Sequence, residues 1–319
     1  MRRLRNLSFI LFAFSLILFG VTRWRELSLQ DTSGPVIKLD SDKIEISVED
    51  PEEKLLEGVT AEDKRDGDVT SSIVVENVST FLRSGTRIVR YAAFDKDMHV
   101  SRVEREMTYT DYRSPEFSIT QPLILAPGKT NLLDHVTVSD VLDGSLKDSI
   151  KVLSDKEFLV DTEGEYEVRL QAANSAGDVS TLPVIVKVEE TNRSTPQILL
   201  FNYVRYLDRG EEFDPYAQIK QVSINGRSYG VEQGRGSYGK EGLSKDEDVV
   251  VGTKQIVVKN PVDTSTPGNY MVKYSMTISV GSDGDRLTGV TYLCVVVRDD
   301  YKLAEDSENI ENAEDSQGE

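Results

Sequence analysis

The sequence predicts an all-β protein of three tandem β-sandwich domains, preceded by one N-terminal transmembrane helix. Two observations predict the sandwiches: turn residues recur at a fixed period, and the segments between them alternate apolar and polar residues. A third observation predicts the helix, because an uncharged, largely apolar run follows three arginines at the N-terminus. The 319 residues can supply two or three domains of about 100 residues each.

The repeat is clearest in the first two predicted domains. Residues 59–67 align without a gap with 136–144, and residues 85–111 align with 164–190. Both stretches of the first pair end in an Asp-Gly turn, and the second pair reads as two alternating strands joined by a short turn. This recurrence is typical of an array of small β modules, whose domains we expect to be largely independent of one another.

The domain boundaries follow from the turns and linkers. We expect the first domain at 36–112, the second at 113–191 and the third at 195–299. The third contains a glycine-rich insertion at 225–252, predicted to be a mobile loop or an extended hairpin because it has little apolar surface to bury. The acidic end, 300–319, has no apolar periodicity and is predicted to be a disordered tail.

The N-terminal 25 residues are predicted to form a cytoplasmic tip and a membrane anchor at about 7–22. The uncharged run at 6–22 has 17 residues and would reach about 25 Å as a helix, the short end for a membrane span. Trp24 between two arginines resembles an interfacial anchor and no good cleavage site follows, so we expect an uncleaved signal anchor, with a cleaved signal peptide as the alternative. The leading arginines place the N-terminus in the cytoplasm and the domains outside the cell, after a polar stalk at 26–35.

The charge of the chain disfavours two classes of partner. The net charge is −18, although the first 25 residues carry five arginines and no acid. A surface this acidic repels phosphate backbones, so we expect no nucleic-acid binding and no adhesion of the folded domains to anionic lipid. The single cysteine, Cys294, lies in an apolar strand and is expected to be a packed thiol.

Several motifs in the first and third domains resemble those of a known family. The first domain has Gly58-Val59-Thr60-Ala61, then Asp66-Gly67-Asp68, then Val89-x-Tyr91-x-Ala93-x-Asp95. This pattern resembles bacterial immunoglobulin-like domains of the insecticidal-crystal-protein type, which are related to hyalin and PKD-like repeats. The third domain is similar at its opening and in its closing hairpin. The resemblance implies an immunoglobulin-like sandwich used on bacterial surfaces as a spacer or as a carbohydrate- or protein-contacting module, with no shared catalytic residues.

Two acidic turns of the first domain form a candidate metal site. Calcium prefers oxygen-rich loops, and the candidate ligands are Asp63, Asp66, Asp68, Asp95 and Asp97. The alternative is that Asp-Gly turns use their carboxylates to accept backbone hydrogen bonds and need no ion. The second domain favours this alternative, because Ser145 and Asn174 stand where two of the acids would be.

No other motif indicates chemistry. His99 and His135 lie in different domains without zinc-site spacing, and the glycines at 226–239 do not join a strand to a helix as a phosphate-binding loop requires. We therefore expect no cofactor, no catalytic residues and no enzyme activity, but a membrane-anchored bacterial surface stalk, adhesion or ligand-binding protein that contacts a protein or glycan outside the cell. The alternatives are an accessory subunit of a cell-envelope polysaccharide or secretion assembly, and an unrecognised enzyme in the third domain.

Overall fold

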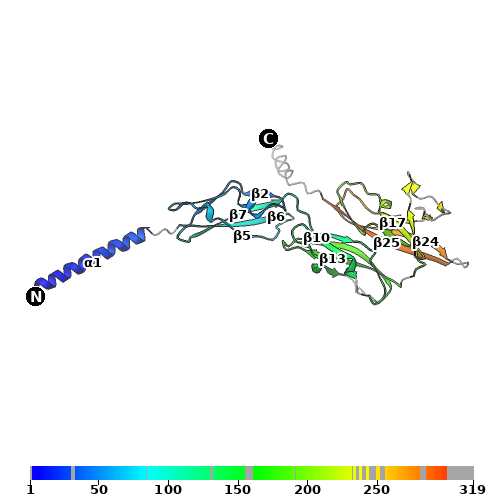
Figure 1. Cartoon of the computed structure of the whole chain (residues 1–319), viewed down its shortest axis with the longest axis horizontal. Helices are drawn as coiled ribbons and strands as arrows, with labels where there is room; N and C mark the ends of the chain where they lie inside the picture. Colours follow the sequence, from blue (N-terminus) through cyan, green and yellow to red (C-terminus); the bar gives the residue numbers. More distant parts are fainter. Residues whose placement is uncertain are drawn as a thin grey trace, which may run out of the picture. The chain divides into compact units, whose positions relative to one another are not determined.

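The fold is mostly β-sheet, arranged in sandwich-like pairs of sheets (Figure 1). The computed structural model describes residues 2–29, 33–83, 85–129, 132–154, 161–190, 192–231, 256–280 and 285–299, with short stretches at 233–234, 237–238, 242–243 and 249–251. The chain divides into two compact units, Met1–Asp111 and Tyr112–Glu319. The predicted tail at 300–319 lies outside the described residues.

The N-terminal helix α1 spans Arg2–Leu29, so it includes the predicted anchor and extends into the predicted stalk. The described side chains of this helix, at 11–24, are all exposed. Within the described part of the chain, no helix combines the length and the apolar character that crossing a membrane requires. The prediction of a transmembrane helix at 7–22 is therefore not supported.

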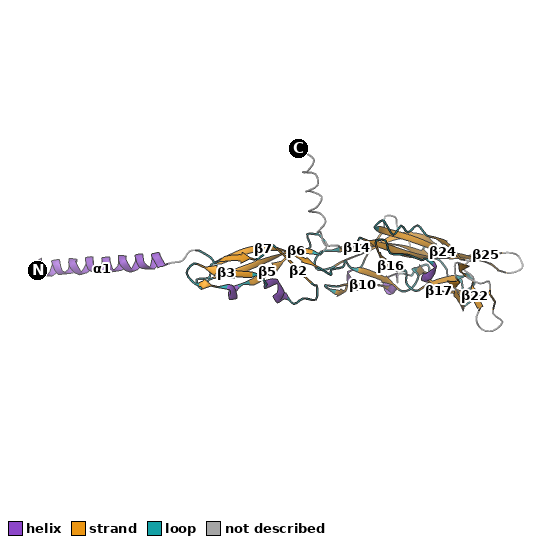
Figure 2. Ribbon diagram, turned by 90° about the horizontal axis from the view of Figure 1, so that it is seen from above, coloured by secondary structure: helices purple, strands orange, loops and turns teal. Residues whose placement is uncertain are grey.

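The sandwich of the first unit consists of two sheets, ordered β1-β3-β4 and β2-β7-β6-β5. Strand β2 pairs with β7 in parallel, and the other pairs are antiparallel. Figure 2 shows short helical turns beside these strands. The elements are β1 Val36–Leu39, β2 Lys43–Ile46, η1 Glu52–Leu56, β3 Val59–Asp63, β4 Gly67–Asp68, η2 Thr70–Ser72, β5 Val74–Val78, β6 Thr86–Phe94 and β7 Val100–Tyr109.

The core of the first unit is built by alternating residues of the two sheets. Val89 and Tyr91 of β6 are fully buried, as the period of two predicts. The Tyr91 hydroxyl donates to the backbone oxygen of Leu55 at 2.6 Å. In the third domain, Tyr274 repeats this arrangement by donating to the backbone oxygen of Pro215 at 2.7 Å. A buried tyrosine thus ties a central strand to the short helical segment in both places.

The second predicted domain repeats the first. Its sheets are ordered β11-β10-β8 and β12-β13-β14-β9, and β9 pairs with β14 in parallel. Gly67 and Gly144 have φ values of +75° and +71°, as the Asp-Gly turns predict. The elements are β8 Glu116–Ile119, β9 Ile124–Leu125, η3 Leu132–His135, β10 Val136–Asp140, β11 Gly144–Ser145, η4 Lys147–Ser149, β12 Lys151–Leu153, β13 Gly164–Ala173 and β14 Val179–Val188.

The third predicted domain ends in the expected hairpin, β24 Gly268–Val280 and β25 Asp285–Arg298. Its sheets are ordered β16-β25-β24-β23 and β15-β17-β18-β22-β21. The described parts of the 225–252 insertion form short strands, some of which extend the second sheet. The remaining elements are β15 Gln197–Leu200, β16 Val204–Asp208, η5 Tyr216–Gln218, β17 Ile219–Ile224, β18 Arg227–Val231, β19 Gln233–Gly234, β20 Ser237–Tyr238, β21 Gly242–Leu243, β22 Val249–Val251 and β23 Ile256–Lys259.

The second and third predicted domains share one hydrophobic core within the second unit. Polar contacts join them as well: the Tyr292 hydroxyl donates to Glu165 at 2.6 Å, and the backbone N–H of Phe117 donates to the Tyr206 hydroxyl at 2.7 Å. The sequence predicts three separate domains, whereas the structure divides into two compact units. Alternation along each strand cannot reveal this, because it reports that a face is buried but not which domain covers it.

Candidate functional site

The carboxylates in the acidic turns of the first domain accept hydrogen bonds from backbone N–H groups. Asp63 ends β3, and its Oδ1 accepts the N–H groups of Arg65 and Asp66 at 2.7 and 2.8 Å. Asp66 in turn accepts the N–H of Lys96 at 3.0 Å, which joins this turn to the β6–β7 turn. Asp68 accepts the N–H of Thr70 at 2.9 Å. These are the contacts expected of Asp side chains that stabilise turns.

The other two candidate ligands have different partners. Asp97 pairs with Arg65 at 2.6 Å on the surface. Asp95 is buried and accepts the N–H of His99, and its Oδ2 lies 2.8 Å from the Nδ1 of the same residue. Burial raises the pKa of Asp95, but the hydrogen bonds from the His99 backbone and ring outweigh it and hold the pKa below its ordinary value.

One buried oxygen in this network has no hydrogen-bond partner. Asp63 is 2% exposed, and its Oδ2 is buried without a hydrogen bond. Within the described ranges, no group of three or more His, Cys, Asp or Glu residues is arranged to hold a metal ion. The calcium site at Asp63, Asp66, Asp68, Asp95 and Asp97 therefore stays a prediction, with most of its carboxylates engaged by the protein's own backbone or side chains.

The second domain carries the same network with different chemistry at one position. Asp140 Oδ1 accepts the N–H groups of Leu142 and Asp143, as Asp63 does for its own turn. Asn174 accepts the N–H of Asp178, and its amide donates to Asp140 Oδ2 and to the Tyr112 hydroxyl. Burial, with Asp178 beside it, raises the pKa of Tyr112. In this domain the buried carboxylate is fully hydrogen-bonded.

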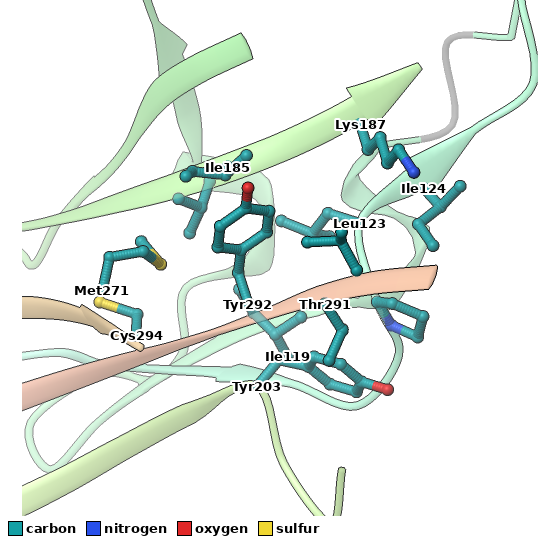
Figure 3. Close-up of a pocket in the computed structure, with 13 residues that line it drawn as sticks. Ile119, Leu123, Ile124, Ile185, Lys187, Tyr203, Met271, Thr291, Tyr292 and Cys294 are labelled. Carbon is teal, nitrogen blue, oxygen red and sulfur yellow. The ribbon is translucent and has the colours of Figure 1, made fainter. Parts of the chain in front are cut away.

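A groove in the second unit lies between the second and third domains. We call it the junction groove; its volume is about 230 Å³, and most of its lining comes from residues 121–125, 195–199 and 289–291. A smaller pocket of about 30 Å³ shares five lining residues with it, which are Pro122, Leu123, Ile124, Val290 and Thr291. Figure 3 shows this smaller pocket, with the side chains of Leu123, Ile124 and Lys187 facing the β25 segment that carries Thr291 and Tyr292. Three segments far apart in the sequence thus form one recessed surface.

The groove depends on a close approach of two backbones. Gly289 of β25 is buried, and a Cβ at this position would lie 1.6 Å from the backbone oxygen of Pro196. Only glycine allows this contact, because any other residue would force β25 and the 195–199 segment apart. An isolated glycine inside a strand is the one sequence signal that could have indicated the groove.

The groove and the smaller pocket each contain one residue singled out in the sequence. His135 ends η3 and lines the groove, whereas His99 belongs to the first unit. Cys294 is a free, buried thiol that lines the smaller pocket, and burial raises its pKa to about 12. The prediction of a packed thiol is confirmed, and a thiol with so high a pKa is a poor nucleophile.

Comparisons with known proteins identify no family. No family model matches the sequence, and the search of curated proteins gave no match. Among solved structures, CBM51-2 in complex with GlcNAc and INT domains from Clostridium perfringens ZmpB is 18% identical over 46% of this chain and 26% of that chain, with a TM-score of 0.21. Protocadherin GammaB4 is 13% identical over 84% and 49%, with a TM-score of 0.18. Surface layer protein SbsC, domains 6–7, is 12% identical over 49% and 99%, with a TM-score of 0.19.

These similarities are weak. The chain spans about a quarter of the length of the ZmpB structure that it matches, and identities of 12 to 18% accompany TM-scores of about 0.2.

Proposed function

We propose that this protein is a non-catalytic binding module, displayed outside the cell, that holds its ligand in the junction groove. The observation that carries the proposal is the groove itself, which combines aliphatic walls with a buried hydroxyl group, that of Thr291. Small-molecule sites typically combine an apolar lining with a few polar groups that fix orientation. The immunoglobulin-like family resemblance, drawn from the repeat motifs, agrees with a surface-displayed binding protein.

The shared core of the second unit supports this proposal. The groove is formed by two domains that pack around one hydrophobic core, which would hold its walls in place before a ligand binds. Preformed sites avoid the entropic cost of ordering on binding. The acidity of the chain, −18, favours protein or glycan ligands over nucleic acids.

The test is a binding screen of the full chain on glycan and peptide arrays, repeated with Leu123→Trp. Leu123 lines the groove, and tryptophan at this position should fill it. A matched control is Leu153→Trp, because Leu153 is 37% exposed on β12 and does not line the groove. We expect the first variant to lose binding and the second to keep it. Equal binding by both would show that the groove is not the site, and no binding by the parent chain would refute the binding function.

The location outside the cell is a separate part of the proposal. It rests on the arginines before the apolar run of α1, which favour a cytoplasmic N-terminus. Protease treatment of intact cells should remove the domains beyond residue 33 if they are outside. Membrane attachment through α1 stays a prediction, and extraction of the full chain from membranes at alkaline pH would contradict it.

A further inference from the structure

The lining of the junction groove includes one buried hydroxyl group, which we take as its inner end. Thr291 is 4% exposed, and its Oγ1 is buried without a hydrogen-bond partner. A buried hydroxyl without a partner is costly, so the site gains from any group that reaches it. The smaller pocket, of about 30 Å³, has room for little more than a water molecule. The larger groove, of about 230 Å³, has room for one small organic molecule and is below the range of drug-sized pockets.

The mouth of the groove is acidic. Glu190 is exposed and Glu189 is half-buried, and both line the groove. Lys187, which lines the smaller pocket, already pairs with Glu189 at 2.5 Å. Among the described residues that line the larger groove, none is lysine or arginine. Glu190 is thus the more exposed of the two acidic residues that line the groove.

The walls between mouth and floor are aliphatic. Leu125, Leu132 and Ile198 are buried and line the groove. A ligand that matches all three zones has a small body with an apolar side, a polar group at its inner end and a positive charge at its outer end. Anionic ligands would meet the carboxylates at the mouth, and no lysine or arginine among the described lining residues would offset the repulsion, although His135 also lines the groove.

We infer that the junction groove binds a small molecule carrying one primary ammonium group, which lies at Glu190 while a polar group at the other end reaches Thr291. This inference rests on the proposed function, because the groove must be the binding site. Amino sugars and amino-acid amides share this chemistry.

The experiment compares amines with their acetylated forms. The full chain is titrated with glucosamine and with threonine amide, and then with N-acetylglucosamine and N-acetylthreonine amide, by calorimetry and by NMR of the leucine and isoleucine methyl groups. We expect at least one amine to bind and to shift the methyl signals of Leu123 or Ile198, and we expect acetylation to weaken that binding about tenfold or more. The amine that binds tells the two ligand sources apart.

Two outcomes overturn the inference. Equal or stronger binding of the acetylated probes, with loss of binding in Leu123→Trp, would leave the groove as a binding site and remove the ammonium. If neither amine binds at millimolar concentration, the inference fails. The array screen then decides the proposed function separately, because it does not depend on an amine.

Variants at the two ends of the ligand refine the test. Glu190→Gln should weaken amine binding by about two- to fivefold and reduce its salt dependence, with no effect on acetylated probes. Thr291→Val keeps the shape of the side chain and removes the unpaired hydroxyl. It should weaken binding by about fivefold while raising the unfolding midpoint of the second unit. A fall in both affinity and midpoint would assign Thr291 a structural role and contradict its place in the site.

Discussion

The amide Nδ2 of Asn174 lies 3.1 Å from Oδ2 of Asp140, and it satisfies a carboxylate whose counterpart in the first domain has no partner. The two domains are equivalent here: Asp63 stands for Asp140, and Asp95 stands for Asn174. A carboxylate in place of the amide cannot donate a hydrogen bond when ionised. The repeat thus contains one position at which the first domain lacks a donor that the second domain has.

The first prediction is that Asp95→Asn stabilises the first unit. The new amide can donate to Asp63 Oδ2 and to His99 Nδ1, as Asn174 donates to Asp140 and Tyr112. Restoring one buried hydrogen bond in a domain of this size should raise the unfolding midpoint by about 4 °C or more at neutral pH. Calorimetry of the full chain measures the change.

The reverse exchange, Asn174→Asp, is the matched control. It removes the donor from the second domain and should lower the midpoint of the second unit, while leaving that of the first unchanged. A decrease on Asp95→Asn would mean that the Asp95–His99 contact contributes more than the missing donor. The hypothesis that the first domain is destabilised by the missing hydrogen-bond donor at position 95 would then be wrong.

The second prediction concerns the backbone contact that shapes the groove. Gly289→Ala places a methyl group against the backbone oxygen of Pro196, which a side-chain rotation cannot relieve. We expect a loss of about 1–3 kcal/mol of stability in the second unit, measured by urea unfolding. Gly230→Ala is the control, because nothing lies within 4 Å of a Cβ at that strand position. Equal effects of both substitutions would show that the close approach is not important.

The sequence predicts local structure well where one period dominates. The β6–β7 and β13–β14 hairpins, the β24–β25 hairpin and the two Asp-Gly turns all follow from alternation and turn chemistry. Tyr91 and Tyr274 are buried at the aligned positions that the repeat indicates. These features depend on neighbouring residues in the chain, which is the information that periodicity contains.

The candidate site could not be predicted in the same way. The groove joins residues 121–125, 195–199 and 289–291, and two of these segments lie in or beside domain linkers without a periodic pattern. Thr291 reads as an ordinary strand residue until its hydroxyl is seen to be buried without a partner. The acidic turns show the opposite problem, because acids at turn positions indicate ion binding and backbone capping equally well.

The third prediction is that the second and third domains unfold together. Leu293 of β25 is fully buried in the core that both domains share. Leu293→Ala should cost about 2–5 kcal/mol, and hydrogen exchange should increase in β13 of the second domain as well as in β24 of the third. Val89→Ala in the first unit is the control and should leave the second unit unchanged. If exchange increases in the third domain alone, the array consists of independent domains, as the repeat by itself suggests.

The last prediction concerns acid stability of the first unit, through Asp111. Its carboxylate accepts the Ser47 hydroxyl at 2.6 Å and the N–H of Val48 at 2.8 Å. The hydrogen bond from Ser47, followed by that from Val48, lowers the pKa of Asp111 below its ordinary value. A lowered pKa in the folded state means that the stabilisation is complete above the unfolded pKa of about 3.9 and is lost as the pH falls through the folded pKa.

Asp111→Asn should therefore lower the urea midpoint of the first unit at about pH 6, and the gap from the parent chain should shrink as the pH falls to about 3 and below. Asp42→Asn, which removes a carboxylate at an exposed position, is the control and should change the midpoint little at either pH. A gap that stays constant with pH would show that the Ser47 and Val48 contacts act through geometry alone. The charge of Asp111 would then contribute nothing to the stability of the first unit.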